Sequence, residues 1–154
     1  MASQPLRIIV GADDAGEALK NAVKEFFEND PRVAEVVDVT DVVGLGAAYP
    51  NVAFEAATRV IAGEADRALL VCGTGLGVAI SANKVKGIRA VTAHDPYSIE
   101  RSVKSNNAQI LCFGGRVIAP QLAVNLASAW LDHEWDPNTP SAAKVDTICA
   151  YEEQ

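Results

Sequence analysis

The stretch from residue 67 to residue 84 constrains the fold more than any other part of the chain. Residues 67–72 form an apolar run that ends on Cys72. Closely spaced glycines follow this run: Gly73, Gly75 and Gly77. Small and apolar residues then recur at helical spacing, so a buried strand, a glycine-rich turn and a short helix follow one another. The N–H groups of such a turn and of the first turn of the helix point at one place, where they form an anion-binding site.

Apolar, β-branched runs alternate with helical patterns over the rest of the chain. The predicted strands cover residues 6–10, 33–39, 67–72, 88–92 and 108–113. The predicted helices cover residues 19–29, 51–62, 78–85, 98–105, 121–131 and 141–151, and a loop is expected over residues 40–49. This alternation indicates an α/β fold with a parallel sheet covered by helices on both faces. Because 49% of the 154 residues are apolar, we expect residues 1–154 to form one domain.

The charge and composition exclude several classes of partner. A net charge of -7 without a Lys/Arg cluster argues against nucleic acid and means that a phosphate group would be held by local contacts. Three cysteines without metal-ligand spacing suggest neither a disulfide framework nor a metal site, so a reducing, cytoplasmic setting is expected. Neither a membrane span nor a signal peptide is predicted. The third glycine of a dinucleotide fingerprint is missing, which disfavours NAD as a cofactor.

Polar side chains follow four of the predicted strands at their carboxyl ends. They are Asp13, Cys72, His94 and Arg116. The carboxyl ends of parallel strands meet at one edge of the sheet, where ligands bind. Cys72 has two interpretations, a small core residue or a thiolate that acts as a base or nucleophile, and its place before the glycine-rich turn favours the second. Cys112 and Cys149 lack such a turn and are interpreted as core residues.

Other polar and aromatic candidates each have a structural alternative. One of Asp13 and Asp14 is expected to cap the following helix, which leaves the other free to contact a ligand. Tyr49, before a proline, either packs on its loop or closes over a sugar. Of the two histidines, His133 lies in a polar connector and is interpreted as a surface residue, so only His94 is a candidate for the site.

The motifs of this chain resemble those of the ribose-5-phosphate isomerase B and galactose-6-phosphate isomerase family. The resemblance rests on Cys-Gly-Thr-Gly-Leu-Gly at 72–77, Ser-Ala-Asn-Lys at 81–84, Gly-Ile-Arg-Ala at 87–90, the loops 11–16 and 113–117, Tyr49-Pro50, Ser98 and Asn106. It extends over nearly the whole chain. It implies a Rossmann-like three-layer αβα sandwich with a five-stranded parallel sheet. It also implies an aldose–ketose isomerase that needs no cofactor or metal and forms a homodimer or homotetramer with shared active sites.

The resemblance assigns a role to each candidate residue. Cys72 would be the base that moves a proton between C1 and C2 through a cis-enediolate, with charge on oxygen stabilised by the loop. That loop would comprise Gly73, Thr74, Gly75 and Gly77. Substrate hydroxyl and carbonyl groups would be held by Asp13, Asn83 and Asn106, with Tyr49 lining the sugar. Arg116 and Lys144 would bind the phosphate, and the helix at 141–151 would reach the site of a neighbouring subunit.

The chain departs from the family pattern at three positions. Asp14 stands where the family has a phosphate-facing histidine, Ser105 where it has a ring-opening histidine, and Pro140 near an expected arginine. A tetrose 4-phosphate cannot close a five-membered ring, because its O4 is esterified, and so it needs no ring opener. Ser105 therefore suggests erythrulose 4-phosphate as the substrate, unless His94 replaces the lost histidine and pentose activity is kept. The alternatives are a galactose-6-phosphate type of hexose phosphate isomerase, alone or as one chain of a two-chain enzyme, and a non-catalytic sugar-phosphate-binding protein.

Overall fold

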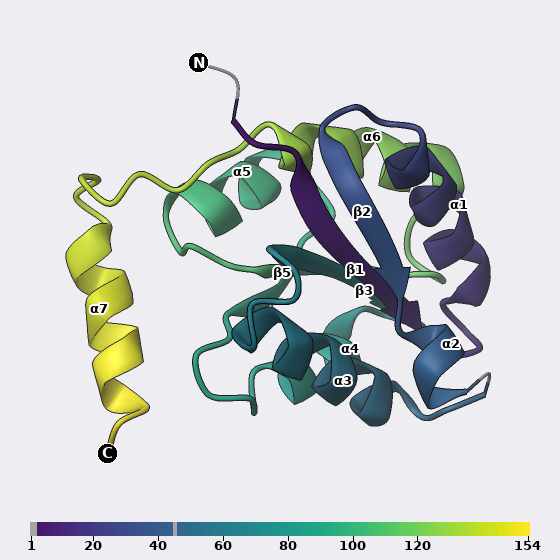
Figure 1. The fold of residues 1–154 in the computed structure, drawn as a ribbon, viewed down its shortest axis with the longest axis horizontal. Helices are drawn as coiled ribbons and strands as arrows, with labels where there is room; N and C mark the ends of the chain where they lie inside the picture. Colours follow the sequence, from purple (N-terminus) through teal and green to yellow (C-terminus); the bar gives the residue numbers. More distant parts are fainter. Residues whose placement is uncertain (1–2, 45) are drawn as a thin grey trace.

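The computed structural model describes residues 3–44 and 46–154, and its centre is a five-stranded, all-parallel sheet (Figure 1). The strands are β1 (Leu6–Ala12), β2 (Val33–Asp38), β3 (Arg67–Cys72), β4 (Ala90–Thr92) and β5 (Ile110–Gly114), in the spatial order β2-β1-β3-β5-β4. The helices are α1 (Glu17–Glu28), α2 (Thr40–Val43), α3 (Tyr49–Ile61), α4 (Leu76–Ala82), α5 (Pro96–Lys104), α6 (Pro120–Leu131) and α7 (Ala142–Tyr151). The predicted α/β fold class with a five-stranded parallel sheet is confirmed.

The two faces of the sheet are covered by helices of different composition. Helices α1, α5 and α6 cover one face, where Phe27, Phe113 and Trp130 fill a core with large side chains. Helices α3 and α4 cover the other face, where buried alanines let the helices approach the sheet closely. Side chains alternate along β3, so that Cys72 belongs to the face under α3 and α4.

The strand order creates a crevice at the carboxyl ends of β1 and β3. Strand β1 pairs with β2 on one side and with β3 on the other. The chain therefore leaves β1 towards one edge of the sheet and returns on the opposite side, which opens a ligand site at this switch point. The loop after β1 carries Asp13, and β3 ends at Cys72. Topology alone thus brings these two residues together.

Some element boundaries differ from those that the sequence predicts. Helix α2 replaces part of the predicted loop because Asp38 Oδ1 accepts a hydrogen bond from the Thr40 N–H (2.9 Å) and so starts a helical turn. Strand β4 begins at Ala90 instead of residue 88, because the Arg89 N–H donates to the side-chain Oε1 of Gln109 (2.8 Å) and not to a neighbouring strand. In the described ranges, no helix is both long and apolar enough to span a membrane.

Helix α7 stands apart from the rest of the molecule at the end of a long connector (Figure 1). The connector leaves α6 in a defined direction, because the guanidinium of Arg67 donates to the backbone oxygens of Trp130 and His133. The same guanidinium lies 5.3 Å from the centre of the Trp130 ring. At its far end, α7 is tied back by the Glu152 carboxylate, which accepts from the Gly87 N–H (2.6 Å).

Candidate active site

A cavity of about 350 Å³ lies at the carboxyl ends of β1 and β3. Its lining comes from the loop after β1, the start of α3, the turn after β3 and the turn after β5. The lining residues are Asp13, Asp14, Ala15, Tyr49, Cys72, Gly73, Thr74, Gly77 and Arg116. The structure thus brings together most of the candidates that the sequence proposes, from positions up to about 100 residues apart.

The thiol of Cys72 lies at the bottom of this cavity, with 4% of the residue exposed. The Gly75 N–H donates to Cys72 Sγ (3.2 Å), so a backbone dipole stabilises negative charge on the sulfur. Gly75 has a φ of +80°, and a Cβ at this position would lie 2.8 Å from the carbonyl carbon of Phe113. Only glycine therefore permits this turn, which explains why the sequence needs glycine here.

The end of β5 holds the loop after Cys72 in place. The Gly115 N–H donates to the Cys72 carbonyl (2.8 Å), and the Arg116 N–H donates to the Gly73 carbonyl (3.0 Å). The Arg116 side chain lies over the loop, since a Cβ on Gly73 would be 3.1 Å from Arg116 Nη1. Among the residues that the structure describes, no carboxylate oxygen lies within 4.0 Å of this guanidinium. Arg116 is thus a cation available to an anionic ligand.

The carboxylates of Asp13 and Asp14 and the ring of Tyr49 complete the lining of the cavity. Asp13 Oδ1 accepts from the Gly16 N–H (3.0 Å), and Asp14 Oδ1 accepts from the Ala15 N–H (2.9 Å). Asp13 thus closes the turn that leads into α1, and both carboxylates also face the cavity. The Tyr49 ring packs against Gly77, where a Cβ would lie 2.5 Å from Tyr49 Cε2.

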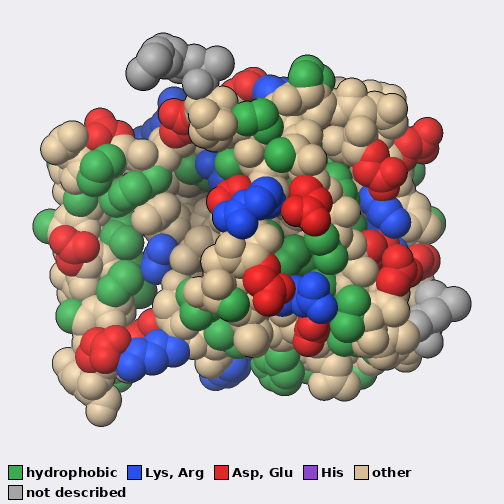
Figure 2. Space-filling model, in the orientation of Figure 1, with side chains coloured by type: hydrophobic (Ala, Val, Ile, Leu, Met, Phe, Trp, Pro, Cys, Tyr) green, Lys and Arg blue, Asp and Glu red, His purple; other side chains and the backbone are tan. Residues whose placement is uncertain are grey.

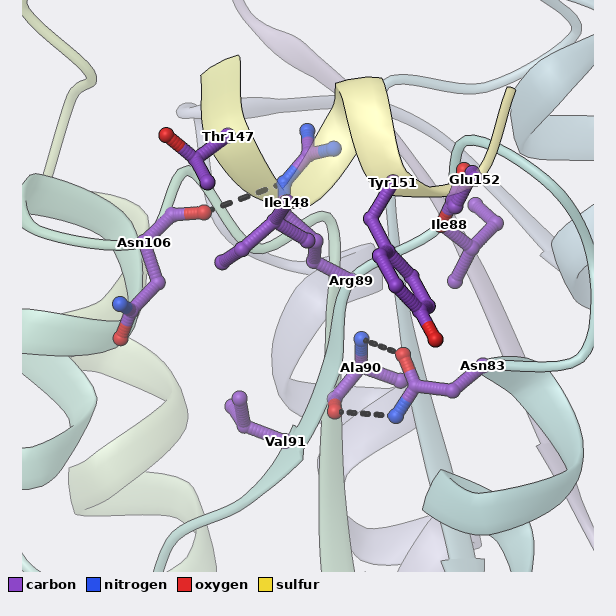
Figure 3. Close-up of a pocket in the computed structure, with 10 residues that line it drawn as sticks. All are labelled: Asn83, Ile88, Arg89, Ala90, Val91, Asn106, Thr147, Ile148, Tyr151 and Glu152. Carbon is purple, nitrogen blue, oxygen red and sulfur yellow. Dashed lines mark hydrogen bonds between the residues drawn. The ribbon is translucent and has the colours of Figure 1, made fainter. Parts of the chain in front are cut away.

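Several of the proposed substrate contacts do not line this cavity, and Figure 3 shows two of them, Asn83 and Asn106, in another part of the molecule. Asn83 and Asn106 line a second cavity of about 630 Å³ between α7 and the body of the molecule. Both ends of the Asn83 amide are engaged there, because Oδ1 accepts from the Ala90 N–H and Nδ2 donates to the Ala90 oxygen (2.8 Å each). Lys144 is exposed on α7. Neither Asn106 nor Lys144 lines the Cys72 cavity of its own chain.

His94 supports the site from outside the cavity. Its Nε2 accepts from the Gly114 N–H (2.9 Å), and its ring lies 5.8 Å from that of Phe113. Burial lowers the pKa of His94, although the neighbouring Asp95 acts in the opposite direction. A neutral ring is the form that accepts at Nε2, so hydrogen bonding and burial favour the same state.

A buried ion pair next to the site was not anticipated from the sequence. Lys20 Nζ lies 2.6 Å from Asp38 Oδ2, and the two side chains are 1% and 4% exposed. The pair adjoins Thr40, whose Oγ1 accepts from the Ala12 N–H directly before the Asp13 loop (3.0 Å). The signal was a lysine on the apolar face of the first helix, where Val23 and Phe27 share its helical row.

The described residues contain no group of three or more His, Cys, Asp or Glu side chains placed to hold a metal ion. Acidic and basic side chains are interspersed over the face in Figure 2, where no large patch of one sign appears. An anion at the Cys72 cavity would therefore be held by local donors such as Arg116 and the N–H groups of the loop.

Residues 8–148 match the family model described as Ribose/Galactose Isomerase. The chain belongs to the ribose/galactose isomerase family. The match spans the loop after β1, the Cys72 turn and most of α7, so it includes every residue that lines the cavity. The family predicted from the sequence is confirmed, and so is the prediction of an aldose–ketose isomerase.

Several relatives match the chain over nearly their whole length. A protein of Mycolicibacterium smegmatis named D-erythrulose-4-phosphate isomerase 2 is 59% identical over 152 residues, which cover 96% of this chain and 97% of the relative. A D-erythrulose-4-phosphate isomerase of Pectobacterium atrosepticum is 44% identical, with 97% of each chain covered. The solved structure of ribose-5-phosphate isomerase B from Clostridium thermocellum superposes with a TM-score of 0.86 at 35% identity, covering 96% of this chain and 97% of that one.

Proposed function

We propose that this member of the family interconverts D-erythrulose 4-phosphate and D-erythrose 4-phosphate. The observation that carries the proposal is the 59% identity, over 96% of the chain, to a protein named for this activity. The chemistry of Ser105 supports it independently. Ser105 ends α5 and stands where the family resemblance places a ring-opening histidine. A tetrose 4-phosphate has no free hydroxyl with which to close a furanose ring, so its isomerase needs no group at that position.

The proposed proton transfer uses Cys72 as the base. The thiolate removes a proton from C1 of the ketose, and an enediolate forms across C1 and C2. The resulting thiol returns the proton to C2, while the hydroxyl proton passes from O1 to O2, so atoms and charges balance. The loop N–H groups and the Thr74 hydroxyl stabilise the charge on oxygen, and Arg116 holds the phosphate.

We infer that the complete site contains residues from two copies of the chain, each copy a single domain that packs its α7 on the other. Lys144 and Asn106 lie outside the Cys72 cavity of their own chain, and α7 stands away from the body. Hydrophobic side chains gather over α7 on the left of Figure 2, and Ile148 and Tyr151 remain exposed. A second copy that covers this face would bring Lys144 to the phosphate, as the resemblance implies. The three cysteines are free thiols, which supports a cytoplasmic location.

The test is to measure kcat/KM for erythrulose 4-phosphate and ribose 5-phosphate with the same purified protein. Preference for the tetrulose phosphate supports the proposal, and a much higher value for the pentose phosphate refutes it. Cys72→Ala should lower the rate by about 10²- to 10⁴-fold, the contribution of a general base. Cys112→Ala is the matched control, because this thiol is buried on the neighbouring strand and does not line the cavity. A variant without Cys72 that keeps full activity would refute the assignment of the base.

A further inference from the structure

Thr92 reaches the loop after Cys72 from outside the cavity. It is the last residue of β4, which is separated from β3 by β5. Its hydroxyl donates to the Gly75 carbonyl oxygen at 2.6 Å, a short hydrogen bond. Thr92 does not line the cavity, so it makes no contact with a bound sugar there.

The peptide between Gly75 and Leu76 is fixed at both ends. Its carbonyl oxygen accepts from Thr92, and its N–H donates to Thr74 Oγ1 (3.2 Å). A peptide unit is planar, so an anchor on its oxygen also sets the direction of its N–H. Gly75 has the left-handed φ of +80° and, as a glycine, can rotate more freely than other residues. An anchor is therefore needed at this particular peptide.

The fixed N–H determines which role the Thr74 hydroxyl can take. A hydroxyl has one donor and two acceptor lone pairs. Because the Leu76 N–H approaches Thr74 Oγ1 from the helix side, the hydroxyl hydrogen is directed away from that peptide. Thr74 lines the cavity, where this hydrogen can be donated to an oxygen that becomes negative.

We propose that Thr92 is a positioning residue for the isomerase reaction, which acts through the Gly75–Leu76 peptide to aim the Thr74 hydroxyl at the enediolate oxygen. The inference rests on the proposed proton transfer at Cys72. It concerns the orientation of a donor, so Thr92 affects the transition state more than the binding of the ground state.

The test starts from Thr92→Val, which keeps the shape of the side chain and suits a strand but removes the hydroxyl. We expect kcat to fall about tenfold with little change in KM, because misorienting an oxyanion donor costs less than the 10²- to 10³-fold loss on deleting one. Thr92→Ser keeps the hydroxyl and should restore most of the activity. Ser102→Ala is the matched control, because Ser102 Oγ donates to the Ile99 carbonyl (2.7 Å) in a buried place on α5, away from the loop. Ser102→Ala should lower Tm by about as much as Thr92→Val does and leave kcat unchanged.

A double-mutant cycle separates positioning from general destabilisation. If Thr92 acts through Thr74, then Thr92→Val should lower kcat by no more than about twofold in a Thr74→Val background. Losses that multiply, or a Thr92→Val variant as active as Ser102→Ala, would overturn the inference. If Cys72→Ala is inactive while the two losses multiply, only the role of Thr92 is wrong. If Cys72→Ala keeps its activity, the proposed chemistry fails first and this inference fails with it.

Discussion

Removing the ammonium of Lys20 should be among the most destabilising single changes in this protein. Lys20→Met keeps the volume and helix propensity of the side chain but leaves Asp38 charged and buried, with 4% exposure. Loss of one partner of a buried ion pair costs about 3–5 kcal/mol. Lys24 Nζ lies 3.5 Å from Asp38 Oδ2 and remains in the variant, so we expect the lower end, about 3 kcal/mol. For a chain of this size, that corresponds to a fall in Tm of about 6–12 °C.

A second substitution should restore most of the stability that Lys20→Met loses. Adding Asp38→Asn removes the unpaired charge and keeps an oxygen that accepts from the Thr40 N–H. The double variant should therefore recover most of the lost stability but stay below the wild type, because Glu17 Oε1, which is 3.1 Å from Lys20 Nζ in the wild type, also loses its partner. Urea unfolding followed by circular dichroism measures the free energy of unfolding of each protein. Lys24→Met, which loses a more exposed ammonium next to the same carboxylate, is the matched control and should cost at most about 1 kcal/mol.

The pH dependence of the stability lost in Lys20→Met tests whether that loss is electrostatic. Burial alone would raise the pKa of Asp38, but hydrogen bonds from Lys20 and Thr40 lower it below 3.8. In the wild type, the stability from the charged carboxylate is present above pH 3.8 and is lost as the pH falls through the lowered folded pKa. In Lys20→Met burial dominates, so the folded pKa is raised and the penalty shrinks as the pH falls from 7 towards 4. A loss below about 1 kcal/mol at pH 7, or a double variant no more stable than Lys20→Met, would refute the reasoning.

Three further predictions follow from the site. The lowered pKa of His94 keeps its ring neutral, so the stability that the ring supplies is complete above pH 6.5 and declines as the pH falls through the folded pKa. The Tm of His94→Gln should therefore fall less steeply with acid than the Tm of the wild type. Equal slopes of Tm against pH would contradict this. Gly77→Ala should lower kcat/KM by about tenfold, because the added Cβ displaces the Tyr49 ring. In a Tyr49→Ala background the same substitution should cause no further loss. A loss that persists there would point to the backbone instead. Ile148→Asp on α7 should dissociate the proposed assembly, which sedimentation experiments would detect. It should also raise KM for the sugar phosphate more than it lowers kcat. An unchanged KM in a dissociated protein would exclude α7 from the site.

The sequence predicted those features whose physical cause is local. The strand that ends at Cys72 and the glycines after it form a continuous pattern, and the structure shows why the turn needs glycine at position 75. The alternation of strands and helices then implied a parallel sheet, whose carboxyl ends meet at one edge. Asp13, Cys72 and Arg116 could therefore be assigned to one site before their distances were known.

The sequence could not predict contacts that depend on the order of strands in space. Thr92 meets Gly75 only because β4 lies next to β5, and Lys20 meets Asp38 only because β2 lies next to β1. Asn83 shows that residues close in sequence can be apart in space. It follows the glycine-rich turn closely in the chain but does not line the same cavity. The rise along α4 of about 1.5 Å per residue carries it about 10 Å from the turn, to the Ala90 backbone. Proximity in the chain is therefore weaker evidence for a shared site than position at a strand end.

The separation of the two cavities suggests a division between chemistry and affinity in the proposed enzyme. The proposed base Cys72, the proposed donor Thr74 and the cation Arg116 all line the cavity of a single chain. Asn106 and Lys144, by contrast, face the second cavity or solvent. Asp14 also lines the first cavity and adds negative charge where the family resemblance places a histidine. Because a single chain with a net charge of -7 offers few cations to a phosphate dianion, we expect the proposed assembly to act mainly by supplying the missing positive charge and only secondarily by shaping the site around Cys72.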